Sequence, residues 1–171
     1  MLMPINIPFG LCQITYGDIN LPIQADEAIF EAIPTYKKIR GGVLGKSVQY
    51  LLADYDVTFD VSFNKENYDI LKLHYPVLND LNDGLVDNPN RVDTTGKRLV
   101  IHPLGTDSKE YDLTIFKAYI EPMTFRREYK KETDKFNVKF VGKPVVFNRK
   151  LEHSYFYIGD SSQLEGVELW H

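Results

Sequence analysis

The feature that most constrains the fold is a run of strict alternation at residues 55–63 (YDVTFDVSF). The odd positions are all apolar, and the even positions carry Asp56, Thr58, Asp60 and Ser62. Successive side chains of a β-strand point to opposite faces, so this period of two predicts a strand with one buried and one wet side. Such a strand needs partners of the same kind, which indicates a β-built protein.

Further strands are predicted on both sides of this run. Residues 48–63 form the longest candidate, and the others are residues 11–16, 19–24, 27–33, 97–103 and 111–121. The last of these changes phase midway, which indicates a bulge or burial on both faces. Residues 123–129 and 136–140 alternate again around a charged tip, so they predict a hairpin whose Phe125 and Tyr129 face the core.

One helix is predicted, at residues 65–75. Asn64 is a favourable N-cap, and Pro76 ends the helix because it cannot continue the hydrogen bonding. The helix carries an apolar stripe formed by Tyr68, Ile70, Leu71 and Tyr75. Residues 79–96 follow and are polar and acidic, which predicts a long loop.

The length of 171 residues favours a single domain. Within it we expect an N-terminal arm at residues 1–10, a β-sandwich at 11–147 and a C-terminal arm at 148–171. The predicted fold class is mainly β, an antiparallel sandwich or barrel with one flanking α-helix and extended arms at both ends. Residues 34–47 hold Lys37, Lys38 and Arg40 followed by glycines, which predicts a mobile loop or a long hairpin tip.

Composition excludes several functional classes. A net charge of −4 argues against a protein that binds nucleic acid through a basic surface. Cys12 is the single cysteine, so neither an intrachain disulfide nor a zinc site built on paired cysteines is possible. The N-terminus lacks the charged start of a signal peptide, and no apolar run approaches the roughly 20 residues of a membrane span. We expect a soluble protein made in the cytosol, with no membrane insertion.

Residues 40–47 (RGGVLGKS) resemble a phosphate-binding loop without meeting its pattern. Arg40 stands where the first glycine is required, and Gly41 leaves too few residues before Gly45. The segment also opens a strand, whereas a phosphate-binding loop opens a helix. A flexible glycine loop is therefore the better interpretation.

Other candidate sites are no more complete. Asp80, Asp83 and Asp87 could form a loose calcium site, but the spacing departs from an EF-hand and favours an exposed acidic loop. The histidines lack metal-binding spacing and the serines lack a nucleophile elbow. No catalytic residue, metal site or cofactor is predicted. A basic cluster, balanced by interleaved acids, consists of Arg126, Arg127, Lys130, Lys131 and Lys135. It predicts a solvated hairpin tip or, as the second choice, a tip that docks on a partner subunit.

The order of these elements resembles a known family. Two stretches carry the similarity, residues 113–122 (LTIFKAYIEP) and residues 136–144 (FNVKFVGKP), together with the long alternating strand and the helix. Over residues 11–147 the chain is similar to the tail tube (major tail) proteins of long-tailed bacteriophages. This resemblance implies a structural virion protein without enzymatic activity, located in the tail and assembled in the host cytoplasm.

The resemblance also implies partners and surfaces. Identical subunits, usually six, would form rings that stack into a tube through which DNA passes, and the tape measure and terminator proteins would be further partners. The implied lumen-lining residues are Asp54, Asp56, Asp60 and Ser62. The implied loop toward the neighbouring ring contains Lys37, Lys38, Arg40, Gly41, Gly42 and Lys46. Both terminal arms would strap neighbouring subunits together.

Two alternatives stay open. The first is another tail component of similar fold, such as a tail terminator or a distal tail protein. The second is a carbohydrate-binding β-sandwich, suggested by the 11 tyrosines and expected to show coplanar exposed aromatic rings.

Overall fold

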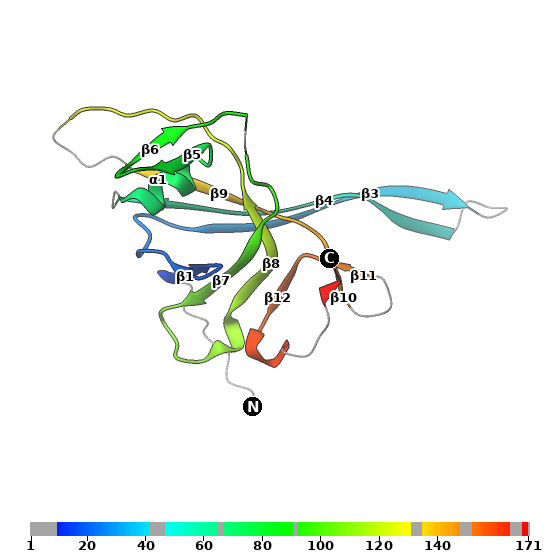
Figure 1. Ribbon diagram of the computed structural model, residues 1–171. Coiled ribbons are helices and arrows are strands. Elements are labelled where there is room, and N and C mark those ends of the chain that lie inside the picture. Colours follow the sequence, from blue (N-terminus) through cyan, green and yellow to red (C-terminus); the bar gives the residue numbers. More distant parts are fainter. Residues whose placement is uncertain are drawn as a thin grey trace.

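The computed structural model describes residues 10–41, 47–64, 67–90, 92–130, 135–147, 152–164 and 169–170. An antiparallel sheet of eight strands dominates it, in the order β2-β1-β7-β8-β9-β4-β3, with β12 also paired to β8 (Figure 1). The strands of this sheet are β1 (Cys12–Tyr16), β2 (Ile19–Asn20), β3 (Ile29–Gly41), β4 (Ser47–Phe63), β7 (Lys97–Pro103), β8 (Leu113–Ile120), β9 (Phe136–Gly142) and β12 (Phe156–Ile158). The mainly β class with one flanking helix is confirmed, and the sheet is not closed into a barrel.

Strand β8 divides the sheet. Its first half pairs with β12 through Ile115 and Phe156, and its second half pairs with β9 through Ile120 and Phe140. In the pairing of β7 with β8, Leu99 lies opposite Ile115 and Lys97 lies opposite Ala118. Between these two pairs β7 advances by two residues and β8 by three, so β8 holds one extra residue there. This bulge confirms the predicted change of phase and re-aims the second half of the strand.

The part of the sheet that ends in β12 and the part that ends in β4 and β3 approach each other through aromatic side chains. Phe30 of β3 lies edge-on to Phe156 of β12, with ring centroids 5.0 Å apart. Tyr55 of β4 meets Tyr155 in the same manner at 4.9 Å. No backbone pairing joins β12 to β3 in the described part of the chain, so the sheet curls without closing.

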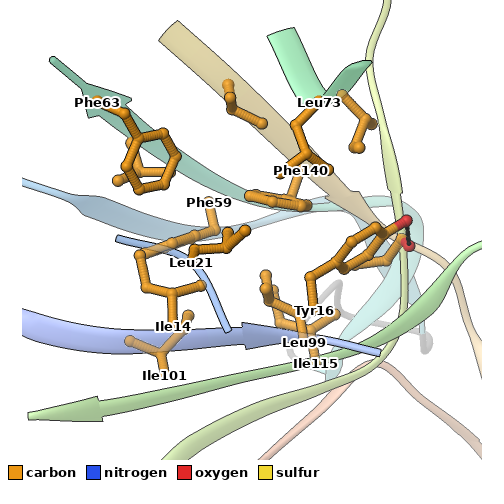
Figure 2. Packing of buried hydrophobic residues seen from close by; sticks show 14 of the residues in the cluster. Ile14, Tyr16, Leu21, Phe59, Phe63, Leu73, Leu99, Ile101, Ile115 and Phe140 are labelled. Atoms are coloured by element: carbon orange, nitrogen blue, oxygen red, sulfur yellow. Dashed lines mark hydrogen bonds between the residues drawn. The ribbon is translucent and has the colours of Figure 1, made fainter. Parts of the chain in front are cut away.

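The core fills the concave side of this curled sheet. Four of the five odd residues of the alternating run, Val57, Phe59, Val61 and Phe63, are at most 4% exposed, and Tyr55 is partly buried. Figure 2 shows side chains from the two parts of the sheet and from the helix meeting in one cluster. The buried Tyr16 hydroxyl donates a hydrogen bond to the Ala118 carbonyl at 3.1 Å, which satisfies a polar group inside the core. The prediction from alternation is confirmed for this buried face.

Helix α1 (Tyr68–His74) and its N-cap both begin three residues later than predicted. The N-cap is Asn67, whose side-chain oxygen accepts from the Ile70 backbone N–H at 2.7 Å, and Asn64 lies outside the helix. The buried face is formed by Ile70, Leu71, Leu73 and His74, so the predicted stripe is confirmed for Ile70 and Leu71 and wrong for Tyr68, which is exposed. His74 Nδ1 lies 2.6 Å from the Asn137 carbonyl, which ties the helix to β9.

The predicted loop at residues 79–96 is wrong in its first half. It contains most of a two-stranded hairpin, β5 (Leu78–Leu81) and β6 (Gly84–Asp87), with a two-residue turn. Asn82 adopts a positive φ of 51° in this turn, which asparagine tolerates better than most residues. The Asn-Asp-Gly sequence was a hairpin signal, but the surrounding acidic residues obscured it.

The predicted hairpin at residues 123–140 is also wrong in its first strand. Residues 121–129 form no strand, because β9 already pairs with β8 on one side and β4 on the other. Phe125 instead stacks on Tyr75 behind the helix, with centroids 5.4 Å apart, and is 40% exposed. Tyr129 is 92% exposed, so neither ring is in the core.

The residues after β9, where a C-terminal arm was predicted, form regular strands in the part that the structure describes. They form a three-stranded sheet of β10 (Val145–Phe147), β11 (Glu152–Ser154) and β13 (Leu169–Trp170), besides supplying β12 to the main sheet. Two short 3-10 turns, η1 (Lys109–Tyr111) and η2 (Ser161–Leu164), complete the described elements. Among the residues described, no helix has the length and apolar character needed to cross a membrane.

The cap assignment gives a direct stability test. Replacing Asn67 by Ala removes the oxygen that satisfies the Ile70 N–H, so we expect a loss of about 1 kcal/mol in the free energy of unfolding. Asn64→Ala serves as the matched control, since Asn64 is exposed and outside the helix. Urea denaturation of both variants measures the difference; an equal loss at Asn64 would contradict the assignment.

Candidate assembly surface

The most unusual feature of the surface is a long ribbon that leaves the body of the protein (Figure 1). Its strands are the outer parts of β3 and β4, residues 35–41 and 47–54, here termed the β3–β4 arm. Their pairing continues to Gly41 and Ser47, with one bulge between Thr35 and Tyr36. The sequence predicted a loop or hairpin tip here, and the structure extends the strand through it. Pro34 is compatible with β3 because this strand lies at the edge of the sheet.

The arm exposes large apolar side chains. Six of them have exposed fractions between 39% and 61%: Tyr36, Ile39, Val48, Tyr50, Leu51 and Leu52. A two-stranded ribbon is marginally stable by itself, and a contiguous exposed apolar patch marks an interaction site. The arm therefore has the composition of a surface that is buried in an assembly.

The two faces of the arm differ in character. One face carries Tyr36, Tyr50, Leu52 and Val48. Residues that lie opposite each other in an antiparallel pair share a face, and the pairing of β3 with β4 places these four on the same one. Tyr36 and Tyr50 lie edge-to-face at 6.3 Å and 80°, and Lys38 Nζ sits 5.9 Å from the Tyr50 ring. The perpendicular rings do not form the coplanar platform that a carbohydrate-binding module would present.

The arm is also basic. Lys37, Lys38 and Arg40 are exposed, and residues 35–41 and 47–53 contain no acidic residue. Of the predicted inter-ring residues, these three and Gly41 lie on the arm as strand residues, while Gly42 and Lys46 lie outside the described residues. Sequence reasoning missed the apolar residues, although the run Tyr50-Leu51-Leu52 outside the alternating pattern was a usable signal.

An acidic patch lies at the base of the arm, on the convex face of the sheet. Asp54 and Asp56 are exposed and Asp60 is partly exposed, as the alternation predicted. Ser62 is only 8% exposed, so its predicted place on a wet face is wrong. The connection between β2 and β3 crosses the end of β4 there, and Ala25 N–H donates to the Ser62 carbonyl at 2.7 Å.

Two glutamates and one lysine join this patch. Glu31 pairs with Thr58 between the aspartates, and Lys139 pairs with Asp60 across the strands. Lys139 Nζ lies 2.7 Å from Glu121, and this hydrogen bond raises the lysine pKa. Burial raises the pKa of Asp60, and Glu31 and Glu121 add to that effect while Lys139 opposes it. Sequence reasoning missed both glutamates because Glu31 lies on β3 and Glu121 directly follows β8, both far from β4 in sequence.

The remaining predicted sites are not assembled. Gly41 ends β3 and Ser47 begins β4, so the glycine segment joins two strands of a hairpin and opens no helix. Asp80 bonds to Lys72 at 3.2 Å. Over the described ranges, no group of three or more histidines, cysteines or acidic residues could hold a metal ion.

The charges of the predicted basic tip are dispersed. Arg126 pairs with Glu128 at 2.7 Å, and Lys135 reaches Asp26 at 2.6 Å, on the connection between β2 and β3. Lys131 lies outside the described residues. This segment does not form one basic patch.

One buried pair was not predicted. His102 Nδ1 lies 2.5 Å from Asp112, which is 5% exposed, and the Asp112 carbonyl accepts from Gly159 N–H at 2.9 Å. The pair joins the ends of β7, β8 and β12, which indicates a structural tie. His102 lies on β7 and Asp112 lies just before β8, so their spacing in sequence carried no signal.

Comparison with solved structures finds a similar fold. The fold is similar to that of the anti-feeding prophage cap, described as the tube terminating cap, with a TM-score of 0.56 and 12% sequence identity. The similarity covers 92% of this chain and 93% of the cap chain. No protein-family model and no curated protein sequence matches the chain. The chain therefore resembles a component of a phage-tail-like structure, without a specific match to the tube protein.

The acidic patch predicts an unusual pH dependence. Folding raises the pKa of Asp60, so the ionised carboxylate destabilises the folded protein at pH values above this raised pKa. The destabilisation disappears below about pH 3.9, the pKa of the unfolded chain. We expect Asp60→Asn to be more stable than the wild type at pH 7, with the gain disappearing near pH 3.5. Urea denaturation at both pH values measures this.

Asp160→Asn is the opposing control. Hydrogen bonds from Ser162 lower the pKa of Asp160, so its carboxylate stabilises the fold at neutral pH and this contribution is lost as pH falls. The Asp160 variant should be less stable than the wild type at pH 7. Shifts of the same sign in both variants would contradict the assignment.

Proposed function

We propose that this chain is a structural subunit of a phage-tail-like assembly and that it terminates the tube. The observation that carries this proposal is the β3–β4 arm, a ribbon with exposed apolar residues on both faces that requires burial. The similarity to a tube terminating cap over nearly the whole of both chains supports it. The terminator, which the sequence left as an alternative, has better support than the tube subunit, because the similar structure is a cap.

The arm suggests how copies associate. It is a different surface from the body of the protein, so an arm of one copy docked on the body of the next makes a heterologous contact. Contacts of this kind generate a closed ring when the rotation closes. We propose such a ring, hexameric by analogy with tail tubes, with other tail proteins as its axial neighbours.

The acidic patch is the proposed lining of the lumen. Its five carboxylates, from Glu31, Asp54, Asp56, Asp60 and Glu121, are offset within the patch by one ammonium group, that of Lys139. An acidic wall repels phosphate, so a DNA duplex could pass without binding to it. The patch lies at the base of the arm, so a ring held together by the arms can present it inward.

Apolar replacements on the arm test assembly. Tyr50→Asp together with Leu51→Asp changes both faces, since the two residues are adjacent in the strand. Each loses about 1.5–3 kcal/mol of burial, so each contact should weaken at least about a hundredfold. Light scattering and negative-stain images of the concentrated protein should show rings for the wild type and monomers for the variant.

Tyr129→Asp is the matched control for this experiment. Tyr129 is 92% exposed and lies away from the arm, so its replacement should leave the rings intact. Far-UV circular dichroism checks that the arm variant keeps its fold. A wild-type protein that stays monomeric at high concentration, or an arm variant that still forms rings, would refute the proposal.

Charge reversal tests the lumen. Rings carrying Asp54→Lys and Asp56→Lys should retain double-stranded DNA at low salt, with binding that weakens steeply as salt rises. Asp83→Lys with Asp87→Lys makes the same charge change on the exposed β5–β6 hairpin and should not retain DNA inside rings. Electrophoretic mobility shift measures binding, and microscopy locates the DNA. Loss of rings in the first variant alone would instead place the patch in a contact between subunits.

A further inference from the structure

An apolar groove lies where the curled sheet fails to close. Its volume is about 780 Å³, within the range of roughly 300–1,000 Å³ of pockets that enclose a ligand. Phe30 of β3 and Phe59 of β4 line one side, and the other side comes from β7, β8 and β12 through Ile101, Leu113 and Ile158. The groove is therefore the missing seam between the two parts of the sheet.

The groove is open and its margins are unpaired. Leu11 and Ile158 at its rim are 49% and 60% exposed, which is high for large apolar residues beside a core. In the described part of the chain, β3 pairs only with β4, and β12 pairs only with β8. Each therefore has one edge on which no other described strand pairs, and proteins normally cover such edges.

The chain itself supplies a segment at the mouth of this groove. Gly10 and Leu11 line it, and residues 1–9 (MLMPINIPF) connect directly to Gly10. A Cβ added to Gly10 would meet nothing within 4 Å, so the space beside Gly10 is open. Nine residues span up to about 30 Å, enough to run along a groove of this size.

The pattern of residues 1–9 matches what the groove requires. The segment has no charged side chain, and its odd positions are all apolar: Met1, Met3, Ile5, Ile7 and Phe9. The even positions hold Leu2, Pro4, Asn6 and Pro8. In an extended chain, the even residues share one face and also direct their backbone groups to one edge. The missing proline N–H groups therefore fall on a single edge, and the other edge is free to pair.

We propose that residues 1–9 lie in this groove of their own chain, with the odd side chains against its apolar walls. The covalent connection at Gly10 favours the same chain, because a short tether gives an effective concentration in the millimolar range. The segment would then cover the seam of the sheet and could pair with one of its two margins through the edge that lacks no N–H group. This proposal goes beyond the proposed function, since it concerns the fold of one subunit, and it differs from the inter-subunit strap that the family resemblance implied.

Cys12 provides a built-in probe. It lines the groove, is 6% exposed and is the only cysteine of the chain, so a thiol reagent reports on a single position. Its Sγ lies 2.9 Å from Gln24 Oε1, another lining residue. If the segment covers the groove, removal of residues 2–9 should expose this thiol to the reagent.

The test is the labelling rate of Cys12 in dilute, monomeric protein at one fixed pH. If the segment occupies the groove about 90% of the time, its deletion should accelerate labelling about tenfold. Ile5→Asp with Ile7→Asp should produce a similar acceleration in the full-length chain. Asn6→Asp, which introduces a charge on the opposite face, is the matched control and should label like the wild type.

Two further measurements decide the occupant. Adding a synthetic peptide of residues 1–9 to the deletion variant should slow labelling again, whereas a peptide with Asp at positions 5 and 7 should not. Far-UV circular dichroism confirms that each variant is folded. Unchanged labelling after deletion overturns the proposal. Wild-type labelling that slows as the protein concentration rises also overturns it, because the cover would then come from a second copy. Neither result depends on whether rings form, so failure here is distinguishable from failure of the proposed function.

Discussion

The structure depends on one strand that serves two environments. Strand β4 is 17 residues long, and its inner half places Val57, Phe59, Val61 and Phe63 in the core while pairing with both β3 and β9. Among the described residues, its outer half pairs only with β3, and its large apolar side chains are exposed. The inner half anchors the ribbon rigidly, because the same hydrogen-bond ladder runs from the core to the arm. A long arm with exposed apolar residues can thus be presented by a small domain.

How much of this could be predicted depends on where the information lies. The alternation of residues 55–63 predicted the buried face correctly, because burial on one side of a strand is a local property. The first strand of the predicted hairpin, residues 123–129, alternates as well and yet forms no strand. Its place beside β9 was taken by β4, in which Phe63 pairs with Phe136 from 73 residues further along the chain, and no local pattern reports that competition. Local pattern predicts which residues can form a strand, and topology decides which do.

The candidate surfaces divide in the same way. The predicted aspartates share the convex face of β4 because their spacing alone puts them there. Ser62 has the same phase but is covered by the connection between β2 and β3. Glu31 reaches the patch from β3, and Glu121 reaches it from the end of β8. The helix gives a parallel case. Asn64 and Asn67 are both good caps in sequence, and the choice follows from the burial of Ile70 and Leu73 against the sheet.

The surfaces left open have a common origin in the open sheet. A closed barrel would have paired β3 with β12 and left neither an edge nor a groove. The present sheet instead brings Phe30 against Phe156 and stops, so apolar surface remains at the seam as well as on the arm. These two apolar regions differ in their flanking charge. The arm is basic, whereas Asp26 and Glu27 line the groove. An uncharged segment suits the groove because it brings no unpaired charge into an apolar site. The basic arm is better suited to a contact in which its lysines remain at the solvated rim. The two surfaces are thus complementary to different partners, one within the subunit and one between subunits.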